Sequence, residues 1–305
     1  MTRALRDKVF LDDEPVRLSI CSITYNHRGF IEACIEGFLN QECDFRVEII
    51  IYDDASTDGT DEVVRRYSEQ YPSIFRTFLS KENLFSKGVN PYYSYVFPAA
   101  LGEYIAICDG DDYWSDPSKL ARQVALLDAE QSVAIAYGAT RAVTANGIVE
   151  EFQNGHERDL TPEELKAGSP INTLTTCFRN IFKAAPPPSF LKSSPIGDLT
   201  VWGMLGYHGS GRFMADLPRA NYRMHSNGVM SMQNPQKQLF MTALAQLTLA
   251  AYHAENDDMA SSKNALHLAI RHINKTGVAQ FAVGKKSKKS FLKTLKRWFR
   301  NTRAN

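Results

Sequence analysis

Three carboxylates crowd into one short segment of the chain. Residues 107–114 read ICDGDDYW and place Asp109, Asp111 and Asp112 directly after an apolar run. Like charges at this spacing repel one another, so a folded protein needs a reason to keep them together. The segment could be a solvated turn, a phosphatase-like aspartyl nucleophile or a cage of oxygen ligands for a cation. An EF-hand is excluded, because Leu120 takes the twelfth position, where that motif needs a bidentate glutamate.

The cation cage agrees best with the position of these acids, since they follow a strand-like apolar segment and do not lie between polar segments. Mg²⁺ and Mn²⁺ are hard cations that prefer oxygen ligands. Mg²⁺ in particular is usually held by one or two carboxylates together with the phosphates of a substrate. The sequence therefore predicts a Mg²⁺ or Mn²⁺ site on Asp109 and Asp111 and a substrate that carries phosphate.

A second acidic cluster, YDDASTDGT at residues 52–60, has two explanations. Ser56 and Asp58 could cap the helix that is predicted to follow. Capping does not require two consecutive acids at the strand tip, however, and a carboxylate there could accept hydrogen bonds from a nucleobase or a ribose. No G-x-G-x-x-G follows the first predicted strand, so a nicotinamide cofactor is not expected.

Strand-like and helix-like segments alternate around these clusters. Strands are predicted at 17–26, 47–54, 74–80, 103–109 and 133–143, and helices at 28–41, 56–71, 90–101 and 116–130. This alternation predicts an α/β fold with a mostly parallel, doubly wound sheet, which binds ligands at the carboxyl ends of its strands. The segments TYN, YDD and CDGDD each follow a predicted strand, so we expect them to meet at one edge. Residues 235–275 predict two amphipathic helices.

Composition narrows the class of protein. The chain is 44% hydrophobic and 23% charged, which is ordinary for a soluble globular protein. Its five cysteines form no C-x-x-C pair, as expected for a reduced, cytoplasmic protein. The first residues lack the apolar core of a signal peptide, and no apolar stretch is long enough to span a bilayer.

Charge is unevenly distributed along the chain. From Lys285 to the end there are nine Lys and Arg residues and no acids, while the whole chain carries only +1. The body is therefore acidic, and nucleic-acid binding is not expected. Segment 285–303 has the pattern of an amphipathic helix on anionic lipid, which would attach the protein to the inner face of the plasma membrane; the alternative is a disordered, solubilising tail. The apolar face of that helix would consist of Phe291, Leu292, Leu295, Trp298 and Phe299.

Three segments together carry a resemblance to a known family. SITYNHRGFIEACIEGFLNQ, EIIIYDDASTDGT and LGEYIAICDGDDYWSDPSKLARQVALL resemble the nucleotide-sugar-dependent glycosyltransferases of family 2, which have the GT-A fold. The resemblance covers residues 17–140 closely and extends more thinly to about 232. It implies that Asp109 and Asp111 bind a divalent cation on the donor diphosphate. The donor-binding residues that it implies in this half are Thr24, Tyr25, Asn26, Asp54 and Asp112.

The second half supplies the remaining site residues that the family requires. Asp198 in PIGDLTVWGMLGYHG (195–209) is the candidate catalytic base, although it could serve only as a first-turn acid of a helix. YRMHSNGV (222–229) resembles the family's Y-R-x-H segment, in which His225 would complete the metal site and Arg223 would contact the diphosphate. Trp114 and Arg179 each have two possible roles, which are lining the acceptor pocket and stabilising the core.

These residues predict a metal-dependent, inverting glycosyltransferase of the hexosyltransferase type. It would move a sugar from a nucleoside diphosphate sugar to a hydroxyl of a carbohydrate or lipid-linked acceptor, in the assembly of a surface polysaccharide or glycolipid. The alternatives are a nucleotidyltransferase acting on sugar phosphates and an inactive sugar- or lipid-binding module. The predicted organisation is a GT-A domain at 1–232 (donor half 17–140, acceptor half 141–232), a helical extension at 233–283 and a basic tail at 284–305.

Overall fold

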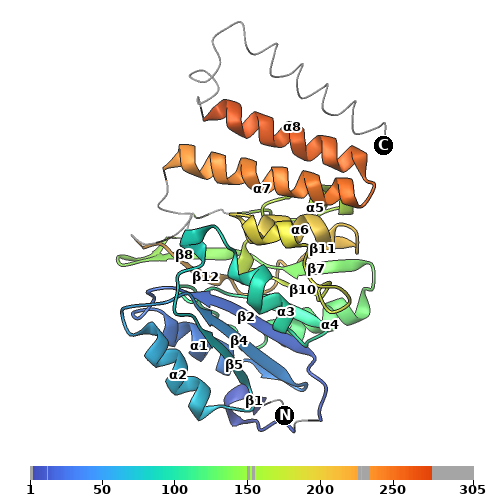
Figure 1. Ribbon diagram of the computed structural model, residues 1–305. Coiled ribbons are helices and arrows are strands. Elements are labelled where there is room, and N and C mark those ends of the chain that lie inside the picture. Colours follow the sequence, from blue (N-terminus) through green and yellow to red (C-terminus); the bar gives the residue numbers. More distant parts are fainter. Residues whose placement is uncertain are drawn as a thin grey trace, which may run out of the picture.

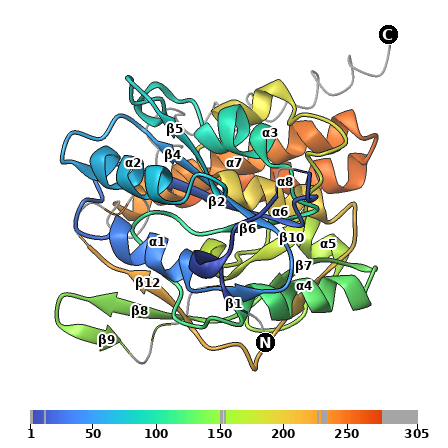
Figure 2. The ribbon, with the colours of Figure 1, turned by 90° about the horizontal axis from the view of Figure 1, so that it is seen from below.

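A seven-stranded sheet forms the centre of the computed structural model, which describes residues 3–11, 13–149, 152, 155–225, 228 and 234–276 (Figures 1 and 2). Four neighbouring strands, β6, β2, β4 and β5, run parallel, and β11 runs parallel to β7. The exception is β10, which lies antiparallel between β6 and β7. The predicted α/β fold with a mostly parallel sheet is confirmed. In spatial order the strands are β11 (Ser210–Phe213), β7 (Val133–Tyr137), β10 (Cys177–Arg179), β6 (Tyr104–Ile107), β2 (Leu18–Thr24), β4 (Val47–Asp53) and β5 (Phe75–Leu79).

The central strands are buried on both faces, as is typical of parallel sheets. In β4, which reads VEIIIYD, every residue is buried. Ile49 and Ile51 belong to one hydrophobic cluster, whereas Ile50 and Tyr52 belong to a second cluster on the opposite face. The first cluster includes α1 (Ile31–Leu39), α2 (Thr60–Gln70) and α4 (Lys119–Ala129), and the second includes η3 (Tyr92–Val96), α3 (Phe97–Ala99) and α6 (Gly197–Leu205).

The segment 90–101, predicted as a regular helix, contains an irregular one. Tyr92–Val96 forms a π-helical turn, in which the backbone N–H of Phe97 donates to the carbonyl of Tyr92, and a single α-helical turn follows. Pro98 stands immediately after this bond and has no N–H to continue the regular α-helical ladder. The wider turn lies beside the acidic loop, and π turns in helices often occur at functional sites.

Two smaller sheets and the helix α5 also lie before residue 226. In one small sheet β12 pairs with β8 in parallel, and a bridge between Asn221 and Tyr113 ties β12 to the acidic loop. This connection brings the YRMH segment to the end of β6. The strands of these sheets and the helix are β1 (Arg3–Ala4), β3 (Glu42–Cys43), β8 (Thr140–Thr144), β9 (Gly147–Val149), β12 (Ala220–Arg223) and α5 (Pro162–Lys166). Short 3₁₀ helices lie at Leu5–Asp7, Phe85–Lys87, Thr173–Thr175 and Ser189–Ser193.

The C-terminal described region is a helical hairpin, α7 (Pro235–Glu255) and α8 (Met259–Lys275), which confirms the two helices predicted at 235–275. Figure 1 shows the hairpin stacked on α6, at the end of the molecule away from the N-terminus. Leu249 of α7 packs where a side chain at Gly203 of α6 would stand, so this glycine permits the close approach. None of the described helices is long and apolar enough to cross a membrane. The predicted lipid-binding segment 285–303 lies outside the described residues.

Asp258 stabilises the start of α8 through its side chain. Its Oδ1 accepts a hydrogen bond from the backbone N–H of Ser261 at 3.0 Å, and its Oδ2 accepts one from Lys166 Nζ at 3.0 Å. The backbone bond and the ion pair hold the pKa of Asp258 well below its ordinary value. We expect Asp258→Ala to lower the free energy of unfolding by about 1 kcal/mol, as loss of an N-cap does, measured by chemical denaturation.

The sign of the pH dependence follows from the lowered pKa of Asp258. Its contribution is complete above the unfolded-state pKa of about 3.9 and is lost as the pH falls below that value towards the folded-state pKa. The difference in unfolding free energy between the wild type and Asp258→Ala should therefore shrink as the pH is lowered. Glu255→Ala, at the exposed end of α7, is the matched control. A difference that stays constant with pH would contradict this role for Asp258.

Candidate active site

Three loops at the carboxyl ends of β2, β4 and β6 meet at one edge of the sheet, as the sequence predicts. Thr24 and Asp53, the last residues of β2 and β4, are register partners. Beyond them the backbone N–H of Asp54 donates to the carbonyl of Thr24 at 2.9 Å, and that of Gly110 donates to the carbonyl of Ile23 at 2.9 Å. The TYN, YDD and CDGDD segments are thus joined by main-chain hydrogen bonds.

Gly110 allows the acidic loop to approach β2 this closely. A Cβ atom at this position would lie 2.6 Å from Thr24 Oγ1 and 3.0 Å from Ile31 Cδ1. Contacts under 3.0 Å require something to shift, and Thr24 is fully buried. Glycine between Asp109 and Asp111 is therefore a steric requirement of this site.

Asp111 lies between two histidines. Its Oδ2 is 3.0 Å from His225 Nε2 and 3.8 Å from His27 Nε2, and the three possible ligand atoms all lie within 4.8 Å of one another. Burial would raise the pKa of Asp111, but the hydrogen bond to His225 and the two imidazoles outweigh it and lower that pKa. The structure brings together Asp111 and His225, both predicted as ligands. It adds His27, which the sequence reasoning missed although His27 directly follows the TYN segment.

Asp109 faces a different neighbour. Its Oδ1 accepts hydrogen bonds from the Tyr92 hydroxyl at 2.5 Å and from the backbone N–H of Ile23 at 3.4 Å. Burial raises the pKa of Asp109 to about 7, and the Asp111 carboxylate adds to the shift. Among the described residues, Asp109 is not part of the group formed by Asp111 and the histidines. Tyr92 belongs to the π turn, and no local pattern in the sequence pointed to it.

Asp112 and Arg223 connect the acidic loop to β12. Asp112 Oδ1 accepts a hydrogen bond from the backbone N–H of Arg223 at 2.7 Å. The guanidinium of Arg223 donates to the Asp111 carbonyl at 2.9 Å and lies 4.4 Å from the ring centre of Tyr113. Burial raises the pKa of Asp112 well above its ordinary value, and the Asp111 carboxylate acts in the same direction. This connection positions His225, two residues after Arg223.

Tyr25 and Asn26 form the loop after β2. The Tyr25 side chain is 44% exposed at the edge of the site. Asn26 has a left-handed backbone (φ 54°), and its Oδ1 accepts a hydrogen bond from the backbone N–H of Thr57 at 2.8 Å. Asn26 also donates its backbone N–H to Ser56 Oγ at 2.9 Å. The loop is therefore fixed to the YDDASTD segment, with Tyr25 exposed at its edge.

The carboxylates of the second acidic cluster accept hydrogen bonds largely from backbone N–H groups. Asp54 accepts hydrogen bonds from the backbone N–H groups of Leu84 and Phe85, at 2.7 and 3.0 Å, so it fixes the loop after β5. Asp58 precedes Gly59, the N-cap of α2, and accepts the backbone N–H of Thr60, the first residue of that helix, at 3.0 Å. Ser56 does not cap this helix; its hydroxyl donates to Asp53, because Ser56 lies in the turn that this carboxylate closes.

Asp198 lies in the first turn of α6. Its Oδ2 accepts a hydrogen bond from the Thr173 hydroxyl at 2.5 Å, and its Oδ1 accepts one from the backbone N–H of Leu199 at 2.7 Å. Burial raises the pKa of Asp198, against the effect of these hydrogen bonds. The charge of Asp198 is also a minor cause of the raised pKa of Asp109.

Trp114 and Arg179, which the sequence left open, are structural. Trp114 is 3% exposed, and its indole N–H donates to the carbonyl of Leu174 at 2.6 Å. Arg179 donates to the backbone carbonyls of Leu127 and Val133 at 2.7 and 2.9 Å, and it pairs with Tyr104 at the start of β6, away from the carboxyl edge. Neither side chain is available to line an acceptor pocket.

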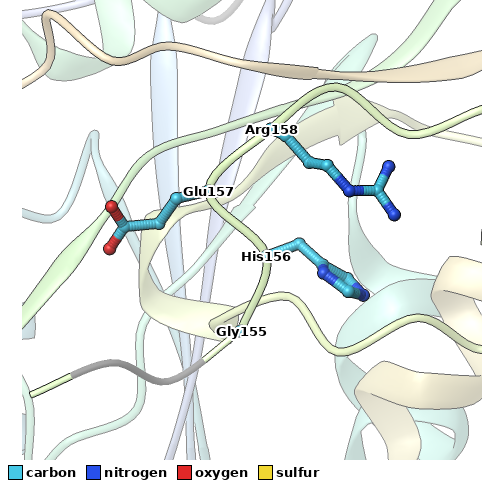
Figure 3. A pocket seen from close by; sticks show the side chains of 4 residues that line it. All are labelled: Gly155, His156, Glu157 and Arg158. Carbon is cyan, nitrogen blue, oxygen red and sulfur yellow. The ribbon is translucent and has the colours of Figure 1, made fainter.

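A separate open hollow is lined by residues 155–158 (Figure 3). Figure 3 shows Glu157 pointing away from His156 and Arg158. Glu157 pairs with Arg219 at 3.1 Å and Arg158 with Glu164 at 2.6 Å, so these charges serve structural ion pairs. The residues that line this hollow include no group of neighbouring acids with shifted pKa values like that at the sheet edge.

Comparisons with known proteins show the family to which the chain belongs. A family model described as glycosyl transferase family 2 matches residues 19–182. An uncharacterized protein of Mycobacterium tuberculosis, Rv1520, is 33% identical over 273 residues, which cover 85% of this chain and 75% of that protein.

Two solved structures show the same fold. Staphylococcus aureus TarS (residues 1–349) in complex with UDP-GlcNAc has a TM-score of 0.61 at 18% identity, over 90% of this chain and 78% of that one. The mannosyltransferase PcManGT of Pyrobaculum calidifontis, in complex with GDP-Man and Mn²⁺, has a TM-score of 0.54 at 18% identity, over 96% and 84% of the two chains. The resemblance seen in the sequence is confirmed, and the chain belongs to glycosyl transferase family 2, as a glycosyltransferase with the GT-A fold.

Proposed function

We propose that this glycosyltransferase is metal-dependent and inverting, and that it transfers a sugar from a nucleoside diphosphate sugar to an acceptor hydroxyl. The observation that carries the proposal is the contact between Asp111 Oδ2 and His225 Nε2 at 3.0 Å, which joins segments 114 residues apart at the carboxyl edge of the sheet. UDP-GlcNAc and GDP-Man in the two structural neighbours support a sugar nucleotide as donor.

The residues at this edge fit a divalent cation. Carboxylate and imidazole are both ligands of Mn²⁺, and Mg²⁺ accepts carboxylate with water and phosphate oxygens. Asp111 and His225 would hold the ion, and Asp109 lies beside them. A bound ion supplies a Lewis acid that neutralises charge on the departing diphosphate. The Mn²⁺ bound to PcManGT supports this assignment.

Asp198 is the proposed base. The Thr173 hydroxyl and the Leu199 amide fix its two oxygens, and burial keeps its pKa above the ordinary value, which strengthens it as a proton acceptor. The acceptor oxygen forms a bond to the anomeric carbon while its proton passes to Asp198 and the bond from that carbon to the diphosphate breaks. Arg223 places a positive charge beside the acidic loop, where it would stabilise the leaving diphosphate.

The acceptor assignment comes from the family resemblance and the charge pattern of the sequence. We propose a carbohydrate or lipid-linked acceptor used in assembling a surface polysaccharide or glycolipid, with residues 17–140 binding the donor and 141–232 the acceptor. The basic segment 285–303 would hold the enzyme at the inner face of the plasma membrane, close to such an acceptor.

A panel of nucleoside diphosphate sugars with Mn²⁺ or Mg²⁺ tests this proposal, with diphosphate release as the measurement. We expect release with at least one sugar nucleotide and a fall of about 10²-fold or more in Asp111→Asn, because the cation loses its carboxylate. Asp216→Asn, an exposed aspartate paired with Arg122, is the control. Pyrophosphate exchange without diphosphate release would instead identify a nucleotidyltransferase.

A further inference from the structure

We propose that His27 is a third protein ligand of the cation, so that Asp111, His225 and His27 form a site of two histidines and one carboxylate that binds Mn²⁺ in preference to Mg²⁺. This inference rests on the proposed function, which already places a cation at Asp111 and His225. It extends that site to the loop after β2, whereas His225 follows β12.

The separations of the two imidazole nitrogens from Asp111 suit one ion. Two atoms that each lie about 2.1 Å from an ion stand about 3.0 Å apart at a right angle and about 4.2 Å apart across it. Asp111 Oδ2 is 3.0 Å from one imidazole nitrogen and 3.8 Å from the other. The 3.8 Å separation from His27 is too long for a hydrogen bond but lies within the range for two ligands of one ion.

His27 is held with the relevant nitrogen towards Asp111. Its Nδ1 lies 3.2 Å from Thr24 Oγ1, and its backbone N–H donates to Thr60 Oγ1 at 2.9 Å. Histidine ligands usually hydrogen-bond through their second nitrogen, which fixes the ring and its tautomer. Thr24 can accept that bond, which would leave Nε2 available to the ion.

The two imidazoles are also arranged around a common space. The rings of His27 and His225 lie edge to face with centres 5.9 Å apart, and the Phe30 ring packs 4.7 Å from that of His225. Both histidine side chains are 13% exposed, so they are shielded but reachable at the edge of the site. Three ligands leave coordination positions open for diphosphate oxygens.

The ligand set decides which ion is preferred. Mg²⁺ favours oxygen ligands and retains several waters, whereas imidazole suits the divalent transition metals. Two imidazoles among three protein ligands therefore favour Mn²⁺ over Mg²⁺. A site built on Asp109 and Asp111 alone would show a smaller preference, since carboxylates suit both ions.

Electron spin-echo spectroscopy of Mn²⁺ bound to the full chain, without donor, tests the inference directly. We expect couplings from two imidazole nitrogens in the wild type and from one in His27→Gln. Titration followed by the electron paramagnetic resonance of Mn²⁺ should show that His27→Gln binds the ion about 10- to 100-fold more weakly. Mg²⁺ should compete with Mn²⁺ less well in the wild type than in the variant. His208→Gln, an exposed histidine after α6, should match the wild type in every respect.

The outcomes separate this inference from the proposed function. Coupling to a single nitrogen in a wild-type enzyme that still releases diphosphate would overturn the role of His27 alone. Absence of Mn²⁺ binding to the wild type would overturn both the role of His27 and the cation of the proposed function. Because the count of nitrogens is taken on the wild type, the test does not depend on the stability of His27→Gln.

Discussion

Replacing Asp198 with asparagine is expected to reduce kcat for sugar transfer by on the order of 10²–10⁴-fold while donor and Mn²⁺ binding persist. Asparagine preserves the local hydrogen bonds, because its oxygen can accept from the Leu199 amide and its NH₂ group can donate to Thr173 Oγ1. It cannot accept a proton from the attacking hydroxyl. The measurements are diphosphate release at saturating donor and acceptor, and Mn²⁺ and donor affinities by calorimetry.

The pH profile should identify the same group. Below its pKa, Asp198 is protonated and cannot act as a base, so kcat of the wild type should fall as the pH falls, with a midpoint above that of an ordinary aspartate. The residual activity of Asp198→Asn should lack this acid limb. Glu163→Gln, an exposed first-turn acid of α5, serves as the control. Full turnover in Asp198→Asn would place the base elsewhere.

Gly110→Ala is expected to damage both stability and activity. Its Cβ atom would overlap Thr24 Oγ1 at 2.6 Å, and Thr24 is buried in the last position of β2. Overpacking of this kind costs about 1–3 kcal/mol of unfolding free energy. The movement that relieves the overlap displaces Asp109 or Asp111, and misplacing reactive groups by about 1 Å can lower the rate by about 10²-fold.

Gly29→Ala is the matched control for this change. Gly29 lies in the loop that leads into α1, and a Cβ atom there would meet nothing within 4 Å. We expect it to leave diphosphate release and the denaturation midpoint close to those of the wild type. Equal behaviour of the two alanine variants would show that the close approach of Gly110 to Thr24 has no functional consequence.

The sequence was sufficient for the α/β fold and for the edge where the site lies. Apolar runs such as IIIY in β4 are buried on both faces of a parallel sheet, and the polar segment after each run must then lie at a strand end. The sequence left the antiparallel strand β10 open, as either a buried strand or an acceptor-lining segment, because three residues carry no clear periodicity. The π turn at Tyr92–Val96 was also missed, since propensity does not distinguish it from an α-helix.

Within the site, the sequence by itself determined which chemical groups stand at the strand ends: the acids of CDGDD and YDD, and the TYN loop. Only the tertiary structure decided how each group is used. Asp54 is bound by amides 30 residues away, Asp109 by Tyr92, and Asp111 by His225 from a segment 114 residues along the chain. Hydrogen bonds and burial set the charge and availability of a carboxylate. These partners come together only when β12, the π turn and the β2 loop pack around the same edge.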